Sequence, residues 1–312
     1  MTTYITIDGG TSNTRVSLVQ NNTVCDSIKL SLGARAGITQ KEILVQAVRQ
    51  AIVDLLAKNN LIEADVTCVL ASGMITSEFG LCSLPHITVP AGIRELHDTM
   101  HRIQLPEITS IPFVFIRGVR QSGATLNEID IMRGEETELI GLIDHAAENS
   151  LFVLPGSHSK LILTDESGRI TSFKTMLTGE MIYALSQNTI LKDVVDLSVD
   201  QINDDYLHQG YEYARKNGLN EALFKVRVLK IVGGHSKEQM YSFFLGAVLS
   251  DEICAIVQSD VTRVVIGGRK QIRLATAQLL RQFSDKTVCC LTDEQVERSV
   301  SNGMIRIYEY AH

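Results

Sequence analysis

The sequence predicts an α/β protein built from two duplicated domains with a cleft between them. The main observation is a pair of similar hairpins about half a chain apart, at residues 4–30 and 151–174. In each, an apolar strand runs into a turn of Gly and small hydroxyl residues, and a second strand, a polar turn and a third strand follow. The same order of elements at two places indicates an internal repeat, and we predict domains 1–145 and 146–312.

The first turn combines glycines with hydrogen-bonding side chains directly after a buried strand. Asp8 ends the strand, and a Mg²⁺ ion could be held by its carboxylate directly or through water. The paired glycines let successive backbone N–H groups face an anion. A glycine-rich turn with a solvated Asp8 explains these residues alone equally well, but the second hairpin favours phosphate binding. The predicted phosphate-binding residues of this turn are Gly9, Gly10, Thr11, Ser12 and Asn13.

The second turn follows a strand of the same kind and carries a lysine. Each hairpin is expected to close on the phosphates of a nucleotide from its own side. A Ser next to a His in one turn does not make a catalytic triad, so a serine hydrolase is not favoured. The predicted phosphate-binding residues of the second turn are Gly156, Ser157, His158, Ser159 and Lys160.

Composition limits the function classes. The 312 residues are enough for two domains, and the net charge of −7 argues against a nucleic-acid or membrane-surface partner. We find no apolar run close to membrane-spanning length and no basic N-terminal region before an apolar core. The six cysteines include no Cys-x-x-Cys pair, which is typical of buried reduced thiols. A soluble cytoplasmic protein is the expected class.

Between and after the hairpins, the apolar spacing predicts helices and buried strands. Neither a Walker A sequence nor a Gly-x-Gly-x-x-Gly motif is present, so the two commonest nucleotide folds are not supported. In the first half we expect a helix from a capping box at 39–42 to about 58, a strand at 66–71, a loop or inserted element at 79–92 and a strand at 112–117. In the second half we expect helices at 178–188, 199–216 and 220–231, another helix opened by a capping box at 236–239, a strand at 261–266, a helix at 272–283, a strand at 287–291 and a closing helix from 293.

Two further places suggest chemistry. Glu135 and Glu136 lie in the first turn of a predicted helix, where they either complement the helix dipole or supply a general base. Gly267 and Gly268 join a buried strand to a helix, an arrangement in which a planar ring can lie against exposed backbone, although a plain turn fits equally well.

Five segments carry a resemblance to a known family. They are residues 8–15 (Asp-Gly-Gly-Thr-Ser-Asn-Thr-Arg), 72–75 (Ser-Gly-Met-Ile), 131–137 (Ile-Met-Arg-Gly-Glu-Glu-Thr), 154–160 (Leu-Pro-Gly-Ser-His-Ser-Lys) and 176–180 (Met-Leu-Thr-Gly-Glu). In these segments the sequence resembles the 2-dehydro-3-deoxygalactonokinase family of the actin-like and sugar-kinase ATPase superfamily. The first segment marks only the superfamily, whereas the third and fourth are specific to the kinase family.

The resemblance implies ATP- and Mg²⁺-dependent phosphorylation of the 6-hydroxyl of 2-dehydro-3-deoxy-D-galactonate in galactonate breakdown. It implies two ribonuclease-H-like domains, the first holding sugar acid and phosphate and the second holding phosphate and adenosine, the latter near Gly267 and Gly268. One departure is Pro155, which stands where the superfamily commonly has an acidic or polar residue. Asp8 is therefore expected to position the metal with water rather than with a second carboxylate.

In the mechanism we expect, Glu135 accepts the proton of the sugar hydroxyl, with Glu136 as the alternative. The candidates for binding the substrate carboxylate are Arg15, Arg120 and Arg133, because each lies beside a proposed cleft motif. A homodimer is possible, but no stretch identifies its interface. The alternatives are a kinase for another sugar acid or sugar, and a non-enzymatic actin-like nucleotide-binding regulator or assembly protein.

Overall fold

The computed structural model describes residues 2–34, 41–145 and 150–311, and the chain forms two compact units. The boundary near residue 146 lies close to the predicted division at 145/146. The predicted second domain, 146–312, nevertheless differs from unit 2. Two of its segments belong to unit 1: the C-terminal helix, and the turn that joins the last two strands of the second hairpin. Unit 1 comprises Met1–Ala146, Thr164–Ser172 and Glu294–His312, and unit 2 comprises Ala147–Leu163 and Phe173–Asp293.

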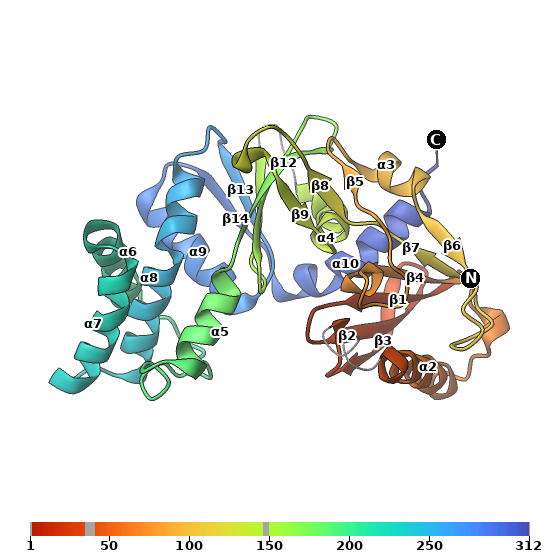
Figure 1. Cartoon of the computed structure of the whole chain (residues 1–312), viewed down its shortest axis with the longest axis horizontal. Helices are drawn as coiled ribbons and strands as arrows, with labels where there is room; N and C mark the ends of the chain where they lie inside the picture. Colours follow the sequence, from red (N-terminus) through yellow and green to blue (C-terminus); the bar gives the residue numbers. More distant parts are fainter. Residues whose placement is uncertain (1, 35–40, 146–149, 312) are drawn as a thin grey trace. The chain divides into compact units, whose positions relative to one another are not determined.

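Unit 1 is organised around a six-stranded sheet in the order β3-β2-β1-β4-β7-β6 (Figure 1). Strand β1 pairs antiparallel with β2 and parallel with β4, so the first hairpin lies beside a parallel strand. The strands of this sheet are β1 (Thr3–Gly9), β2 (Thr14–Gln20), β3 (Thr23–Leu30), β4 (Cys68–Gly73), β6 (His101–Ile103) and β7 (Phe113–Phe115). A small sheet in the order β5-β8-β9 contains β5 (Ile87–Thr88), β8 (Val119–Gln121) and β9 (Asp130–Met132).

The two faces of the main sheet of unit 1 are covered by different helices. Ile5 and Ile7 are fully buried in a core that includes the apolar side of α2. On the opposite face, the Thr6 hydroxyl hydrogen-bonds to Ser301 of α10, and the Tyr4 hydroxyl donates to Glu309, directly after α10. Because side chains alternate along a strand, Asp8 lies on the α10 side, where β1 ends. The helices of unit 1 are α2 (Lys41–Lys58), α3 (Ile93–Asp98), α4 (Glu135–Leu142) and α10 (Asp293–Tyr308), with short 3₁₀ helices at Glu63–Asp65, Met74–Thr76, Leu126–Glu128 and Ile143–His145.

Unit 2 repeats the strand order of the first hairpin and its neighbours. Its sheet has the order β12-β11-β10-β13-β14, with β10 antiparallel to β11 and parallel to β13, and this matches β3-β2-β1-β4-β7 of unit 1. The predicted internal repeat is confirmed by this topology. The strands are β10 (Ser150–Leu154), β11 (Ser159–Thr164), β12 (Ile170–Met176), β13 (Arg263–Ile266) and β14 (Thr287–Cys290).

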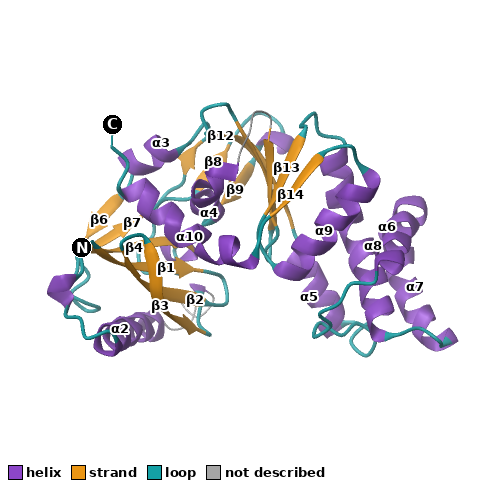
Figure 2. Cartoon of the chain, turned by 180° about the vertical axis from the view of Figure 1, so that it is seen from behind, coloured by secondary structure: helices purple, strands orange, loops and turns teal. Residues whose placement is uncertain are grey.

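The helices of unit 2 pack around α8, which lies alongside α6 and α7 (Figure 2). Helix α8 has 21 residues and is long and apolar enough to cross a membrane, which corrects the expectation that no such run exists. Most of its residues are buried inside unit 2, as in the core helix of a globular domain. The helices are α5 (Thr178–Asn188), α6 (Asp204–Asn217), α7 (Leu219–Val232), α8 (Lys237–Val257) and α9 (Lys270–Phe283).

Helix starts follow their capping residues. The predicted helix from residue 199 begins instead at Asp204, because the Asn203 side chain accepts a hydrogen bond from the Tyr206 N–H at 3.1 Å and ends the extended segment before it. The capping box of Ser236 and Gln239 is confirmed at the start of α8. The capping box predicted at 39–42 includes residues outside the described ones.

Candidate active site

The end of β1 in unit 1 brings two carboxylates and an arginine together. Asp8 is half-buried and lies opposite Arg15 on β2 and Ser72 on β4. Burial raises the pKa of Asp8 above its usual range, the charge of Arg15 partly offsets this, and the charge of Glu135 raises it further. The negative charges of Asp8 and Glu135 therefore act on each other, and a cation beside Asp8 would be stabilised.

The Gly9–Gly10 turn is held by close backbone contacts within unit 1. A Cβ atom at Gly9 would lie 2.6 Å from the Cβ of Ile75, and one at Gly73 would lie 2.4 Å from the Gly9 carbonyl oxygen. Gly73 also has a φ of 84°, a conformation that favours glycine. The Gly10 N–H donates to the Asn13 carbonyl at 2.8 Å, which closes the turn. The Ser-Gly-Met-Ile segment thus shapes the turn, a role that its sequence did not reveal.

Two adjacent glutamates at the start of α4 have different surroundings. The Glu136 side chain is fully buried, and its two carboxylate oxygens accept from the Gly134 N–H at 2.9 and 2.8 Å. Burial, with a smaller contribution from the charge of Glu135, raises the pKa of Glu136 to about 7. Glu135 is half-buried and accepts from the Arg133 N–H at 3.0 Å. Of the two candidate bases, Glu135 is the one with an accessible surface.

The three arginines considered for the substrate carboxylate have different partners. Arg133 donates to the Thr76 carbonyl at 2.8 Å and the Leu84 carbonyl at 3.0 Å, so it ties a loop of unit 1 in place. Arg120 is exposed on β8, and its side chain donates to the Thr88 hydroxyl at 3.3 Å. Arg15 pairs with Glu297 of α10 at 3.3 Å.

Arg120 and Arg133 meet around a histidine that sequence reasoning missed. Burial, together with the positive charges of Arg133 and Arg120, lowers the pKa of His86 to about 4. His86 is therefore neutral at physiological pH, and its surroundings are positive. Arg15 lies elsewhere, beside Asp8. The structure thus brings two of the three arginines together, and these two create a positive environment of the kind that suits an anionic group.

In unit 2, the turn of the second hairpin is also locked by backbone contacts. A Cβ atom at Gly179, in the first turn of α5, would lie 2.0 Å from the Gly156 carbonyl oxygen. The Glu180 N–H donates to the Ser157 carbonyl at 2.9 Å, and the Glu180 carboxylate lies 3.5 Å from His158. The start of α5 and the hairpin turn therefore form one packed element.

Two of the predicted phosphate-binding residues of this hairpin have buried side chains. Ser159 is fully buried and Lys160 is 3% exposed, whereas Gly156, Ser157 and His158 are half-buried. The exposed surface of the turn thus belongs to its first three residues.

The Gly267–Gly268 turn between β13 and α9 packs against the same hairpin. The Gly267 N–H donates to the Val153 carbonyl at 2.9 Å, and a Cβ at Gly268 would lie 2.2 Å from the Pro155 carbonyl oxygen. Gly268 has a φ of 68°, so both its conformation and its close contact require glycine. The second glycine is therefore needed by the fold, whether or not a base stacks on it.

Two arginines after this turn were missed by sequence reasoning, although they directly follow the paired glycines. Arg269 donates to the Ser157 hydroxyl at 3.0 Å, and its N–H donates to the Pro155 carbonyl at 2.7 Å. Arg273 is 3% exposed and donates to the Gly268 carbonyl at 2.9 Å and to Asp293. Hydrogen bonds from Arg269 and Arg273 thus join the turn of the second hairpin, the Gly267–Gly268 turn and the start of α9.

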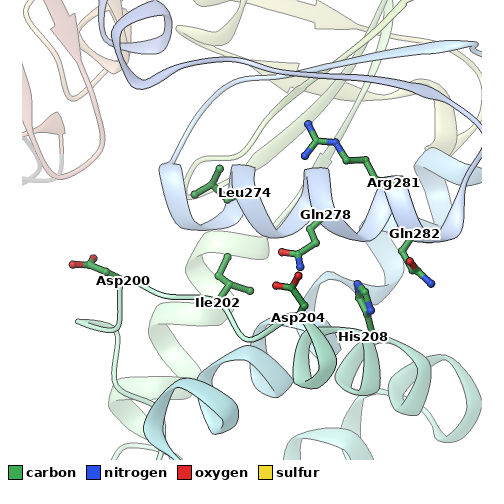
Figure 3. A pocket seen from close by; sticks show the side chains of 8 residues that line it. All are labelled: Asp200, Ile202, Asp204, His208, Leu274, Gln278, Arg281 and Gln282. Atoms are coloured by element: carbon green, nitrogen blue, oxygen red, sulfur yellow. The ribbon is translucent and has the colours of Figure 1, made fainter.

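A cavity of about 510 Å³ lies between α9 on one side and the start of α6, with the segment leading into it, on the other (Figure 3). A second cavity of about 340 Å³ in unit 1 includes Arg15 and residues of β3 and α10. Neither is lined by the glycine turns. The larger cavity is lined by Asp200, Ile202, Asp204, His208, Leu274, Gln278, Arg281 and Gln282.

The donor set suits Mg²⁺ only if the ion keeps other ligands. Among residues 2–34, 41–145 and 150–311, no group of three or more His, Cys, Asp or Glu side chains could hold a metal. Magnesium commonly binds one or two carboxylates together with waters and substrate phosphates. Asp8, close to the charge of Glu135 and to the first turn, fits that mode of binding.

Comparisons with known proteins show which proteins this chain is similar to. The 2-dehydro-3-deoxygalactonokinase of Escherichia coli K12 is 28% identical over 258 residues, covering 81% of this chain and 80% of that protein. A crystal structure from Sinorhizobium meliloti, assigned to the same activity, superposes with a TM-score of 0.77 at 21% identity and covers 97% of both chains.

A more distant structure shows the fold alone. The activator of 2-hydroxyisocaproyl-CoA dehydratase from Clostridium difficile, solved with ADPNP, has a TM-score of 0.53 at 12% identity and covers 98% of this chain and 95% of that one. These likenesses identify the two-domain actin-like ATPase fold. The family model described as 2-keto-3-deoxy-galactonokinase matches residues 8–307, and the chain therefore belongs to the 2-keto-3-deoxy-galactonokinase family of sugar-acid kinases.

Proposed function

We propose that this chain is a cytoplasmic enzyme that transfers the γ-phosphoryl group of ATP to the 6-hydroxyl of 2-dehydro-3-deoxy-D-galactonate in galactonate breakdown. The observation that carries the proposal is the family match over residues 8–307, which includes the turns of both hairpins, the Gly267–Gly268 turn and the start of α4. Phosphoryl transfer depends mainly on positioning and on neutralising charge. The packed turns of each unit are suited to both tasks.

In this proposal the turns of the two hairpins, Gly9–Gly10 and Gly156–Ser157, each bind nucleotide phosphates, and Gly267–Gly268 lies beside the adenosine. Bound Mg²⁺ would neutralise charge on the phosphates, and Asp8 would hold it with water. The backbone N–H groups around Gly9 and Gly156, fixed by the close contacts described above, would cost little reorganisation on binding.

We assign Glu135 as the general base and Arg120 as the partner of the substrate carboxylate. Glu135 is half-buried, whereas Glu136 is fully enclosed and bonded to its own helix start. Arg133 is committed to two backbone carbonyls, which leaves Arg120 as the exposed cation beside His86. A bidentate guanidinium–carboxylate contact would orient the sugar acid.

The test is a coupled assay of ADP release with a panel of sugar acids, including the galactonate compound and its gluconate epimer. Glu135→Gln is expected to lower kcat by about 10²- to 10⁴-fold, the usual contribution of a general base, with little change in KM. Glu138→Gln, which removes a charge from the same helix turn, is the matched control and should keep near-normal turnover.

Two results would overturn parts of this proposal. Turnover stimulated only by another sugar acid would reject the substrate, and no stimulation by any of them would reject the kinase activity. If Glu136→Gln loses turnover while Glu135→Gln keeps it, the base assignment moves to Glu136.

A further inference from the structure

A buried carboxyl group in α8 lies next to the second hairpin, which belongs to unit 2. Glu252 is 1% exposed, and one of its oxygens, Oε2, accepts from the Thr178 hydroxyl at 2.5 Å. Burial raises the pKa of Glu252, and the hydroxyls of Thr178 and Ser159 partly offset this. A buried acidic group in a core helix is costly, so its presence calls for a structural or functional reason.

Thr178 is the first residue of α5 and is itself 4% exposed. The next two residues contact the hairpin directly, since Gly179 lies against the Gly156 carbonyl and the Glu180 N–H donates to the Ser157 carbonyl at 2.9 Å. A change in the position of Thr178 must therefore be transmitted to the hairpin turn. Through Thr178, the carboxyl of Glu252 is thus connected to this turn by a continuous chain of contacts.

The same network includes the hairpin from its other side. Ser159 is fully buried at the start of β11, and its hydroxyl is close enough to lower the pKa of Glu252. Within the described part of the chain, neither the Ser159 Oγ nor the Glu252 Oε1 has a hydrogen-bond partner of normal geometry. Buried polar atoms are nearly always satisfied, so both oxygens require one. Each of these two oxygens is the candidate partner of the other, because the Ser159 hydroxyl acts on the Glu252 carboxyl.

We propose that Glu252 is a positioning residue, which links α8 to the start of α5 and to β11 and so holds the Gly156–Ser157 turn in the geometry that receives nucleotide phosphates. The part concerning phosphates rests on the proposed function, whereas the link between α8 and the turn does not. Glu252 would touch neither nucleotide nor sugar acid. It would act only through Thr178 and Ser159.

Three variants separate this role from a general effect on stability. Glu252→Gln keeps an acceptor for Thr178 in a neutral group, whereas Glu252→Leu keeps the volume and removes every hydrogen bond. Ser242→Ala is the matched control: Ser242 is a fully buried residue of the same helix that accepts from the Asn203 N–H at 2.8 Å, away from the hairpin.

The first measurement is amide hydrogen exchange at Glu180 without nucleotide, together with ATP binding by calorimetry. Because the Thr178 hydroxyl loses its acceptor, Glu252→Leu should speed exchange at Glu180 and weaken ATP binding, each by about tenfold or more. Glu252→Gln should stay within about threefold of the wild type for both. In turnover, the loss in Glu252→Leu should appear in KM for ATP and not in KM for the sugar acid.

Two outcomes would overturn the inference. The first is equal exchange at Glu180 in Glu252→Leu and Ser242→Ala, which would make Glu252 an ordinary core residue. The second is a Glu252→Gln variant as impaired as Glu252→Leu, which would show that the negative charge matters. If the wild type binds no ATP, the proposed function fails, while exchange at Glu180 still decides whether Glu252 holds the turn.

Discussion

Replacing Glu136 with glutamine should change how the stability of the protein depends on pH. The carboxyl is fully buried at the start of α4 and accepts hydrogen bonds from the Gly134 N–H and, at 3.0 Å, from the Thr137 hydroxyl. A glutamine side chain has the same shape and can still accept these bonds through its carbonyl oxygen. The variant therefore removes the ionisation of this group and little else.

The size of the effect follows from the two pKa values of Glu136. The ordinary value is 4.5, and burial with the charge of Glu135 raises it to about 7 in the folded protein. Between these values the folded chain holds a proton that the unfolded chain has released, so the free energy of unfolding falls as pH rises. At about 1.36 kcal/mol per pKa unit, the loss is about 3 kcal/mol and is complete above about pH 7.

Urea unfolding between pH 5 and 8.5 measures this effect. The chain contains no Trp, so far-ultraviolet circular dichroism is the suitable signal. The free energy of unfolding of Glu136→Gln, relative to the wild type, should rise by about 3 kcal/mol across this range. Glu138→Gln should show no such trend. Parallel pH curves for Glu136→Gln and the wild type would refute the reasoning, because they would mean that the carboxyl titrates normally.

Three further predictions concern the glycine turn of unit 2 and the arginines of unit 1. Gly179→Ala should raise KM for ATP by about tenfold, because its Cβ would lie 2.0 Å from the Gly156 carbonyl oxygen of the hairpin. The control is Gly218→Ala, at a φ of 89° with no neighbour within 4 Å, which should only lower the melting temperature. Equal changes of KM in the two variants would contradict this prediction. Arg133→Ala should cost about 3 kcal/mol in urea unfolding, since two backbone carbonyls lose a charged donor, and an unchanged midpoint would reject a tethering role. Arg120→Ala should raise KM for the sugar acid by about 10- to 100-fold without a change in melting temperature. Arg15→Ala breaks an exposed ion pair with Glu297 and should change the free energy of unfolding by less than about 1 kcal/mol. If KM for the sugar acid rises in Arg15→Ala and not in Arg120→Ala, the carboxylate site moves to Arg15.

Local sequence patterns predicted much of this fold because the forces behind them are local. A strand followed by paired glycines and hydroxyl residues specifies a turn through backbone freedom and alternation of apolar side chains. The Ser236–Gln239 capping box predicts a helix start from two hydrogen bonds within four residues. The repeat of such elements was enough to predict the duplicated topology. Such patterns predict helix starts less well than helices themselves: α6 begins at Asp204, after the capping residue Asn203, and not at residue 199 as predicted from the apolar spacing.

The orientation of neighbouring side chains could not be predicted in the same way. Glu135 and Glu136 are adjacent, and one step along an α-helix turns a side chain by about 100°. Which of them is enclosed depends on what packs around α4. Ser72, 64 positions away in the chain, donates to Glu136, as does the neighbouring Thr137. Burial, and with it the raised pKa of Glu136, is decided by this packing.

Sequence patterns alone were enough to identify the hairpins, the internal repeat, the glycine turns and the resemblance to the kinase family, because each depends on residues close together in the chain. The folded chain was needed to show that α10 belongs to unit 1, that Arg133 ties a loop while Arg120 stays exposed, and that Glu252 lies next to the second hairpin. These facts depend on contacts between residues that are far apart in the chain, from a separation of 32 between Thr88 and Arg120 to one of 305 between Tyr4 and Glu309. Such contacts form because apolar faces are buried together, and the burial of one face determines which polar groups are enclosed with it.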